Sequence, residues 1–312
     1  MSAALRAPAG FPEVLPPLSG RATQAAALAS FTWFRVGGPA EVMVRPADTE
    51  DLAAFLAALP PEVPVAVIGA ASNLIIRDGG IPGIVVRLPA RGFGGIVVEE
   101  DGVIAGAAAL DATVAEHAAQ AGLAGLEFLS GVPGTVGGAV AMNAGAYGGD
   151  VAGILDWADI VCRTGETRRL SAAELSLAYR YSALPPGAVV VRARFSARPG
   201  ERAPIAERMA AIRAAREATQ PIRARTGGST FRNPPGMKAW ELIAAAGCRG
   251  LARGGAVVSE KHCNFLINTG GASAADLEGL GEEVRARVRE TTGVMLEWEI
   301  RRIGIPVQEH TP

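Results

Sequence analysis

Cysteine and histidine are scarce in this sequence, and neither follows a pattern typical of metal sites or disulfide frameworks. The 312 residues include three cysteines, Cys162, Cys248 and Cys263, which is an odd number with no C-x-x-C pair. This spacing predicts no bound metal and no disulfide framework. We expect reduced, buried thiols in a cytoplasmic protein.

Several catalytic and nucleotide-binding signatures are also missing. The chain has no G-x-G-x-x-G motif, no G-x-x-x-x-G-K-[ST] motif and no H-E-x-x-H motif. Ser229 is not in a G-x-S-x-G turn, because Phe231 occupies the final glycine position. Nothing supports a Ser-His-Asp hydrolase. His117 is expected to be exposed on a helix, and His262 is expected to be a structural or rim residue.

Charge of one sign and long apolar runs are lacking as well. The net charge is −1, from 30 basic and 31 acidic residues, so there is no electrostatic reason to expect nucleic acid or an anionic membrane as a partner. Residues 1–20 contain no apolar signal region and are interpreted as a proline-rich tail. The longest uncharged stretch, 128–149, contains seven glycines and is a poor membrane helix.

The segments that are present predict an α+β protein. Short β-branched runs bounded by Gly, Pro or Asp predict strands at 41–46, 63–69, 83–88, 95–100 and 189–195. Capping residues and apolar periodicity predict helices over 48–60, 111–122, 201–221, 237–247 and 273–290. The capping signals are Asp48 or Thr49 at the start of the first helix, Gly122 at the end of the second, and Ser273 with Asp276 at the start of the last. The composition changes near residue 200, which predicts a domain of 21–200, a second domain of 201–304 and a C-terminal tail of 305–312.

The last predicted strand, 295–304, alternates cleanly between apolar and charged residues. One face carries Leu296, Trp298 and Ile300, and the other carries Glu297, Glu299 and Arg301.

Two glycine-rich stretches are candidates for ligand binding. In 67–80, a strand runs into Gly-Ala-Ala-Ser-Asn, where small residues let backbone N–H groups approach a pyrophosphate and where Ser72 and Asn73 can add donors. On its own, this pattern favours an ordinary turn at the end of a strand.

In the second stretch, 129–150, glycine is too frequent for a helix or strand to be stable by propensity. We predict that a bound anionic, aromatic cofactor orders this second stretch, because long unstructured loops are uncommon in compact domains. The alternative is a mobile loop.

A third candidate is LAYRYS, residues 177–182. Arg180 lies between two tyrosines, which suits a carboxylate or phosphate partner. The hexapeptide alone favours a surface arginine with packed tyrosines.

Together these stretches resemble the UDP-N-acetylenolpyruvoylglucosamine reductase (MurB) family, flavoenzymes of peptidoglycan synthesis. The matching pieces occur in family order and span residues 31 to 304: FRVGGPAEVMVRP, IGAASNLII, GVPGTVGGAVAMNAGAYGG, YRYS, GGSTFRNP, KAWELIAAAGCRG, VSEKHCNFLIN and GVMLEWEIRRIG. The chain is similar to the shorter, type II branch. It departs from the family at Ala71, where a second glycine is usual; the methyl group is tolerable if φ is negative there.

The resemblance implies a FAD-binding domain of the vanillyl-alcohol-oxidase (PCMH) type in two subdomains split near residue 80, followed by a C-terminal α+β substrate-binding domain. It implies non-covalent FAD, NADPH as hydride donor, a monomer in the cytoplasm and UDP-N-acetylenolpyruvoylglucosamine as the substrate. The residues expected at FAD are Gly69, Ala70, Ala71, Ser72, Asn73, Gly131, Gly134, Thr135, Gly137, Gly138, Asn143, Ala144, Gly145 and Arg301.

The resemblance also implies three catalytic residues. Arg180 and Glu299 match the family's residues at the substrate carboxylate, and Ser229 matches the serine that protonates C2 after hydride addition to C3. A positioned hydroxyl can protonate a strongly basic carbanion-like centre, so Ser229 needs no histidine. Alternation places Glu297 on the same strand face, and only the family match selects Glu299. Tyr179 and Asn233 are the expected substrate contacts.

Two other functions remain alternatives. One is a FAD-dependent alcohol oxidase of the same fold, and the other is a non-catalytic protein that binds a nucleotide sugar.

Overall fold

The structure, a computed structural model, describes residues 15–307 and divides into two compact units, each built from separate stretches of the chain. Unit 1 contains residues up to Gln24, Glu41–Ala70 and Gly83–Ala215. Unit 2 contains Ala25–Ala40, Ala71–Pro82 and the residues from Arg216 onward. The predicted bounds of the two domains, 21–200 and 201–304, stay predictions. The tails predicted for 1–20 and 305–312 lie largely outside the described residues.

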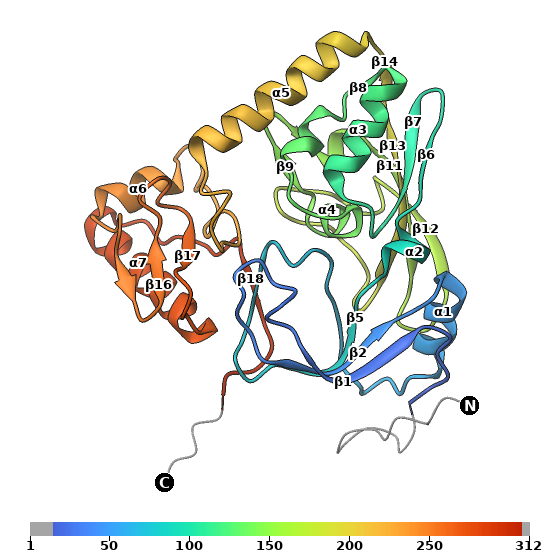
Figure 1. The fold of residues 1–312 in the computed structure, drawn as a ribbon, viewed down its shortest axis with the longest axis horizontal. Coiled ribbons are helices and arrows are strands. Elements are labelled where there is room, and N and C mark those ends of the chain that lie inside the picture. Colours follow the sequence, from blue (N-terminus) through green and yellow to red (C-terminus); the bar gives the residue numbers. More distant parts are fainter. Residues whose placement is uncertain (1–14, 308–312) are drawn as a thin grey trace. The chain divides into compact units, whose positions relative to one another are not determined.

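The larger sheet of unit 1 is antiparallel, with the order β12-β11-β13-β7-β6 (Figure 1). Its strands are β6 (Ile96–Val98), β7 (Gly102–Gly106), β11 (Leu155–Val161), β12 (Thr167–Ser171) and β13 (Val189–Ser196). Two helices, α3 (Asp111–Ala121) and α4 (Val136–Met142), pack beside β7 and β13 (Figure 1). Their buried faces share one apolar core with Phe195 and Ala193 of β13.

A second sheet has the order β1-β2-β5-β3. It consists of β1 (Arg21–Ala27), β2 (Pro39–Arg45), β3 (Val65–Val67) and β5 (Ile81–Val86). Helix α1 (Thr49–Ala58) buries Leu52, Phe55 and Leu56 in the same core as strands β2 and β5. The carboxylate of Asp48 accepts a hydrogen bond from the Asp51 N–H at 2.8 Å, so the predicted start of this helix is confirmed.

Unit 2 is built around helix α7 (Ala274–Thr292). Ser273 and Asp276 form the capping box that the sequence predicts. Leu277, Leu280 and Val284 of α7 are buried against helix α6 (Ala239–Ala245) and a small sheet. The sheet contains β15 (Ala252–Arg253), β16 (Ala256–Val258) and β17 (Leu266–Asn268), and a separate parallel pair joins β4 (Leu74–Ile76) to β18 (Arg301–Ile303).

The long helix α5 (Arg202–Thr219) follows the predicted change in composition, and Ile205 and Met209 are its buried residues. The remaining elements are short. They are α2 (Ala90–Phe93), β8 (Leu123–Ala124), the 3-10 turns η1 (Glu127–Gly131) and η2 (Val151–Gly153), β9 (Gly145–Ala146), β10 (Gly149–Asp150) and β14 (Arg198–Pro199).

Two predictions about local structure need correction. The glycine-rich stretch contains a helix, α4, although its composition argued against one. Val136, Ala139 and Val140 of α4 are buried beside β13, so tertiary packing overrides propensity there. The last strand is regular only over Arg301–Ile303 and is preceded by a single bridge between Phe231 and Trp298. The predicted alternation of burial holds in part: Leu296 and Ile300 are buried and Glu297 and Arg301 are exposed, but Trp298 and Glu299 are both half-buried.

Cys248 and Cys263 are buried as expected, whereas Cys162 is only half-buried. All three cysteines are free, and burial raises the pKa of the Cys248 and Cys263 thiols. His117 is exposed on α3. Within 15–307, no group of three or more His, Cys, Asp and Glu side chains is arranged to hold a metal ion.

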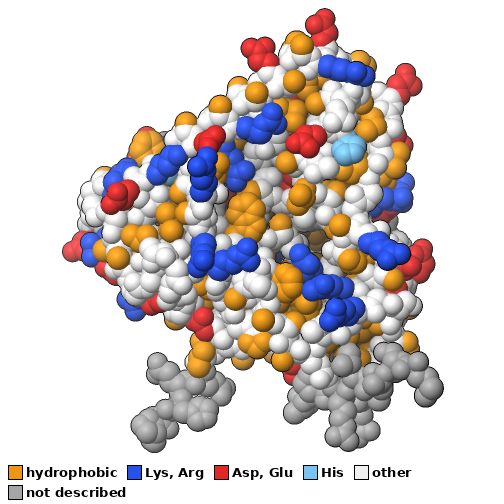
Figure 2. Space-filling model, viewed as in Figure 1, with side chains coloured by type: hydrophobic (Ala, Val, Ile, Leu, Met, Phe, Trp, Pro, Cys, Tyr) orange, Lys and Arg blue, Asp and Glu red, His pale blue; other side chains and the backbone are white. Residues whose placement is uncertain are grey.

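The surface carries both signs of charge. On the face shown in Figure 2, basic and acidic side chains lie among apolar and uncharged ones. In the part of the chain that the structure describes, none of the helices combines the length and apolar character needed to cross a membrane.

Candidate functional site

The two glycine-rich stretches predicted to bind FAD meet within unit 1 at Gly69 and Thr135. A Cβ added to Gly69 would lie 2.5 Å from the Thr135 Oγ1 atom. Thr135 is the residue that precedes helix α4, and Gly69 follows strand β3. Residues far apart in the sequence are therefore adjacent, and glycine is required at position 69 for this approach.

The glycines of the second stretch divide into two kinds. A Cβ on Gly137 would lie 3.0 Å from the Ala107 Cβ atom, and one on Gly134 would lie 2.8 Å from the Asp111 Oδ2 atom. These glycines let the stretch pack closely on the chain below it. Gly138, by contrast, is exposed, and the nearest atom to an added Cβ would be Thr135 Oγ1 at 3.8 Å. Gly69 and Gly138 thus expose backbone that no side chain covers, and both lie close to the Thr135 hydroxyl.

This arrangement fits a dinucleotide cofactor. A pyrophosphate needs close approach to backbone N–H groups and hydroxyl donors, which two exposed glycines and Thr135 permit.

Ala71, in unit 2, does not have the backbone conformation that its methyl group was expected to require. Its φ is +50°, so the sequence-based condition of a negative φ is not met, and the residue holds a left-handed conformation that glycine adopts without strain.

Asn143, another predicted FAD residue, is engaged with the protein. Its Nδ2 atom donates to the Ala178 carbonyl at 2.9 Å, and its Oδ1 atom accepts from the Ala152 N–H at 2.8 Å. The residue is buried and adopts a left-handed conformation at the end of α4. Its side chain therefore ties the glycine-rich stretch to the turn that carries Arg180.

The Arg180 turn is a tight reversal closed by paired hydrogen bonds between Ala178 and Tyr181. Arg180 has φ = +55°, and its guanidinium carbon lies 5.1 Å from the centre of the Tyr179 ring. Tyr179 is 52% exposed. A bulky residue in the left-handed region stores strain, which is typical of functional positions.

Ser229 and Glu299 belong to adjoining chain segments of unit 2. The carbonyl oxygen of Thr230, the residue after Ser229, accepts a hydrogen bond from the Glu299 N–H at 2.8 Å. Ser229 and Glu299 are both half-buried. The Thr230 side chain is fully buried, so it points away from the surface that Ser229 reaches.

The predicted FAD turn also reaches the Glu299 segment within unit 2. The Asn73 Nδ2 atom donates to the Glu299 carbonyl at 3.3 Å, and the Arg301 N–H donates to the Asn73 carbonyl at 3.1 Å. Strand pairing of Leu74 with Arg301 continues this contact. Three predicted site residues, Asn73, Glu299 and Arg301, are thereby brought together.

Burial distinguishes Glu297 from Glu299, which the alternation of the last strand placed on the same face. The Glu297 side chain is 76% exposed and lies 3.9 Å from the Arg232 guanidinium, whereas Glu299 is half-buried. Asn233 is exposed, and its Oδ1 atom accepts from the Ala239 N–H at 3.0 Å, where α6 begins.

Comparisons with known proteins identify the family of the chain. Residues 220–303 match the family described as UDP-N-acetylenolpyruvoylglucosamine reductase, C-terminal domain, and residues 40–171 match the family described as FAD binding domain. The chain is 70% identical to a UDP-N-acetylenolpyruvoylglucosamine reductase of Acidiphilium cryptum, over 94% of each chain. It is 67% identical to one of Granulibacter bethesdensis, over 95% of each.

The chain belongs to the MurB family. Its fold agrees with that of the solved MurB of Thermus caldophilus, with a TM-score of 0.79 and 35% identity over 92% of this chain and 100% of that one. The predicted α+β class, with a FAD-binding domain and a MurB-type C-terminal domain, is confirmed. The chain is a FAD-dependent oxidoreductase of the MurB family that acts on a small-molecule UDP-sugar.

Two buried polar residues near the predicted site had no signal in the sequence. Asp111 lies below Gly134, and neither of its carboxyl oxygens has a hydrogen-bond partner among the described residues. Burial raises the pKa of Asp111 to about 8. Asn264 is buried beside the Ser229 loop. Asp and Asn are usually surface residues, so only the fold shows that these two are inside.

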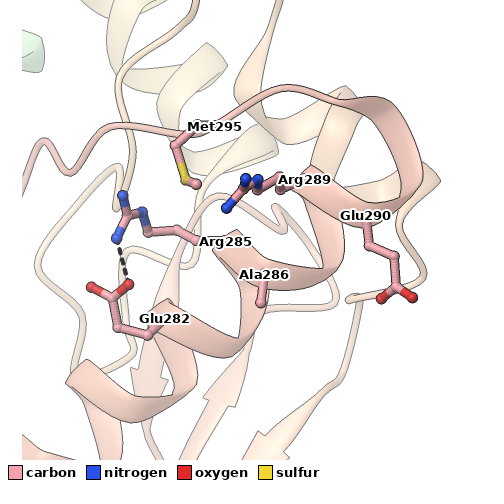
Figure 3. A pocket seen from close by; sticks show the side chains of 6 residues that line it. All are labelled: Glu282, Arg285, Ala286, Arg289, Glu290 and Met295. Atoms are coloured by element: carbon pink, nitrogen blue, oxygen red, sulfur yellow. Dashed lines mark hydrogen bonds and ion pairs between the residues drawn. The ribbon is translucent and has the colours of Figure 1, made fainter.

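An open hollow on helix α7 is distinct from the predicted site residues (Figure 3). It is lined by Glu282, Arg285, Ala286, Arg289, Glu290 and Met295. The close-up shows an ion pair between Arg285 and Glu282 across one helical turn. None of the lining residues was predicted to bind FAD or substrate.

Proposed function

We propose that this protein reduces the enolpyruvyl ether of UDP-N-acetylglucosamine to UDP-N-acetylmuramate with electrons from NADPH, and that Arg180, Ser229 and Glu299 act on the reacting group. Bound FAD would supply the hydride chemistry that links NADPH oxidation to reduction of the enolpyruvyl group at C3. Gly69, Thr135 and Gly138 would hold the cofactor, and the remaining predicted FAD residues are proposed as further contacts.

Charge develops on the substrate when hydride reaches C3. The electron pair of the C2–C3 double bond moves onto C2 and its carboxylate, giving an enolate-like species. The guanidinium of Arg180 binds this carboxylate through two parallel N–H donors. A cation placed before reaction stabilises the charge without reorganisation, which is the largest catalytic effect available to such a site. The strained backbone of Arg180 supports this role, because folding alone does not favour arginine at φ = +55°.

Ser229 donates the proton that completes the reduction at C2. The observation that carries this proposal is the 2.8 Å hydrogen bond from the Glu299 N–H to the Thr230 carbonyl, which holds the Ser229 loop beside Glu299. Glu299 is proposed to lie at the substrate carboxylate. Tyr179 and Asn233 are proposed as further substrate contacts, and the protein is proposed to act as a monomer in the cytoplasm.

The experiment follows the two half-reactions separately by flavin absorbance. Holoenzyme is first reduced with NADPH without oxygen and is then mixed with UDP-N-acetylenolpyruvoylglucosamine. Ser229→Ala should be reduced at the wild-type rate and reoxidised by substrate roughly 10²- to 10⁴-fold more slowly, the usual effect of a positioned general acid. Thr230→Ala is the control and should be far milder.

The same measurement distinguishes the alternatives. Oxidation of NADPH without consumption of the UDP-sugar would favour an alcohol oxidase, and protein that binds the UDP-sugar without any flavin would favour a binding protein. Reoxidation of Ser229→Ala at the wild-type rate would remove Ser229 from the mechanism.

A further inference from the structure

The backbone around Ser229 is hydrogen-bonded four residues before the serine, where the Arg225 carbonyl accepts from the Asn268 N–H at 2.9 Å, and directly after it, at Thr230. Gly228, just before the serine, has φ = +81°, a conformation that glycine adopts without steric strain. The peptide group after the serine is held firmly, because the Thr230 N–H donates to the Asn264 carbonyl at 2.7 Å. The orientation of Ser229 therefore depends on how the two residues after it, Thr230 and Phe231, are held.

The Asn264 side chain also forms two hydrogen bonds with the backbone of Phe231. Its Oδ1 atom accepts from the Phe231 N–H at 3.0 Å, and its Nδ2 atom donates to the Phe231 carbonyl at 2.8 Å. Asn264 is only 3% exposed, so water cannot replace these bonds. A carboxamide is suited to this contact because it presents an acceptor and a donor in one plane, matching the N–H and C=O of a single residue.

The opposite edge of the same short segment carries Glu299. The Thr230 carbonyl accepts from the Glu299 N–H at 2.8 Å and from the Ile300 N–H at 3.3 Å. The peptide group that joins Thr230 to Phe231 thus binds the Glu299 segment through its carbonyl and the Asn264 side chain through its N–H. Residues 230–231 form a bridge with Asn264 on one side and Glu299 on the other.

Asn264 itself is held in place by its neighbours. Its N–H donates to the His262 Nδ1 atom at 3.3 Å, and the His262 ring packs against Phe265 with ring centres 4.8 Å apart. On the far side of the bridge, the Phe231 ring packs against Trp298 with ring centres 5.1 Å apart. The bridge is therefore anchored in the apolar core of unit 2.

We infer that Asn264 is a positioning residue for the second half-reaction, which sets the Ser229 hydroxyl relative to Glu299 by clamping the backbone of Thr230 and Phe231. This inference rests on the proposed roles of Ser229 and Glu299. It assigns Asn264 no contact with substrate, and its effect on proton delivery passes through Ser229 alone.

The test compares Asn264→Ala with Asn268→Ala in the holoenzyme. Asn268 is a matched control, because it is also buried, at 4% exposure, and its Nδ2 atom donates to a backbone carbonyl, that of Phe34, at 2.7 Å. Asn264→Ala should slow substrate reoxidation of the flavin about 10- to 100-fold, the usual cost of a small misplacement of a catalytic group. The KM for the enolpyruvyl substrate and the rate of reduction by NADPH should stay near wild type. Asn268→Ala should leave both half-reactions unchanged at a similar loss of thermal stability.

Hydrogen exchange provides a readout that does not depend on turnover. A peptide covering 226–236 should lose amide protection in Asn264→Ala, because the Phe231 N–H loses its partner, and should keep it in Asn268→Ala. If Asn264→Ala does not fold, Asn264→Asp keeps the shape and the acceptor for the Phe231 N–H while removing the donor to the Phe231 carbonyl. The same slower reoxidation is expected from it.

A double variant separates this inference from the proposed function. In Ser229→Ala, adding Asn264→Ala should cause no further loss in reoxidation, because the clamp acts through a hydroxyl that is already absent. Full additivity of the two losses, or a wild-type reoxidation rate in Asn264→Ala with lost exchange protection, would overturn the inference and leave the proposed function standing. A wild-type rate in Ser229→Ala alone would instead overturn the proposed function.

Discussion

Arg180 occupies a backbone conformation that arginine seldom adopts, and the rest of the turn explains how it is held there. Paired hydrogen bonds between Ala178 and Tyr181 close the turn, and the Asn143 side chain binds the Ala178 carbonyl. Because these contacts involve residues on either side of Arg180, they determine its φ of +55° irrespective of the side chain at position 180. The guanidinium is thus presented at a cost in backbone energy of the order of 1–2 kcal/mol.

Arg180→Lys should slow reoxidation by substrate more than reduction by NADPH. Lysine keeps the charge but loses the planar pair of donors that holds a carboxylate. Stopped-flow absorbance of the flavin measures both half-reactions in one preparation. Equal losses in the two would count against the proposed role.

The strain itself can be tested with Arg180→Gly. Glycine adopts φ = +55° freely, so the variant should unfold at a slightly higher temperature than the wild type while losing reoxidation by substrate. The gain should correspond to at most about 1 kcal/mol, because a freer unfolded chain offsets part of the relieved strain. A drop in thermal stability would show that the Arg180 side chain contributes more to the fold than its strained backbone costs.

Ala71 is a second residue whose conformation matters more than its side chain. It is buried and has φ = +50° in the turn predicted to bind pyrophosphate. Ala71→Val should lower the free energy of unfolding by at least about 1–2 kcal/mol, because a β-branched residue is a genuine outlier in the left-handed region. Ala71→Gly should stay within about 1 kcal/mol of wild type, since relief of strain offsets the lost methyl contact and the freer unfolded chain. Urea denaturation of the three proteins measures both differences.

At the scale of elements, the sequence predicted the helices and strands that are stabilised by local signals. The Asp48 cap, the Ser273–Asp276 capping box and Gly122 at the end of α3, with φ = +74°, are all present as expected. Helix propensity gave a wrong prediction for the glycine-rich stretch. There, burial of Val136 and Val140 stabilises helix α4 against the local preference. Packing against a strand distant in the chain cannot be seen in a local pattern.

The residues of the candidate site likewise divide into those that local motifs reveal and those that only the fold reveals. Motif resemblance selected Ser229, Glu299 and Asn73, and the structure places the loop of Ser229, the carbonyl of Glu299 and the side chain of Asn73 in one hydrogen-bonded network of unit 2. Asn264 and Asp111 were not foreseen, because their importance lies in burial and in partners distant along the chain.

Two neighbouring glycines of α4 should respond in opposite ways to a bulky residue. Gly138→Leu should give folded but colourless protein, because position 138 is exposed with no atom within 3.8 Å of an added Cβ, while the side chain would occupy the space proposed for FAD. Gly137→Leu should instead lower thermal stability by several degrees, because its Cβ would press on Ala107 at 3.0 Å. Flavin absorbance per protein and a melting curve read the two effects. Full flavin occupancy in Gly138→Leu would contradict the proposed cofactor contact.

At the scale of the whole molecule, the contents of the two units explain why the sequence pieces had to be combined. Arg180 belongs to unit 1, whereas Ser229 and Glu299 belong to unit 2. Each unit has its own apolar core, and each contains part of the predicted FAD turn, Gly69 and Ala70 in unit 1 and Ala71 to Asn73 in unit 2. A single short motif thus contributes residues to both units.

The stability of the whole protein should depend on pH through Asp111. Burial raises the pKa of this carboxyl to about 8, while in the unfolded chain it returns to about 3.9. Between these values the native state holds a proton that the unfolded chain has released. The contribution of Asp111 is therefore fully present below about pH 4 and is lost as the pH rises through about 8, at up to about 1.4 kcal/mol per pH unit.

Asp111→Asn removes this titration while keeping a neutral side chain of the same size below Gly134. The free energy of unfolding of the wild type minus that of the variant should fall steadily from about pH 5 to about pH 8 and level off above about pH 9, measured by urea denaturation in steps of one pH unit. Taking the difference cancels the other titrating groups of the chain. Glu116→Gln, on the exposed face of the same helix, is the control for removing an acidic group as such. A difference for Asp111→Asn that is independent of pH would mean that the carboxyl is already ionised in the native protein and is satisfied by a partner such as bound water, and Gly134 would then lie above a charge rather than above a proton donor.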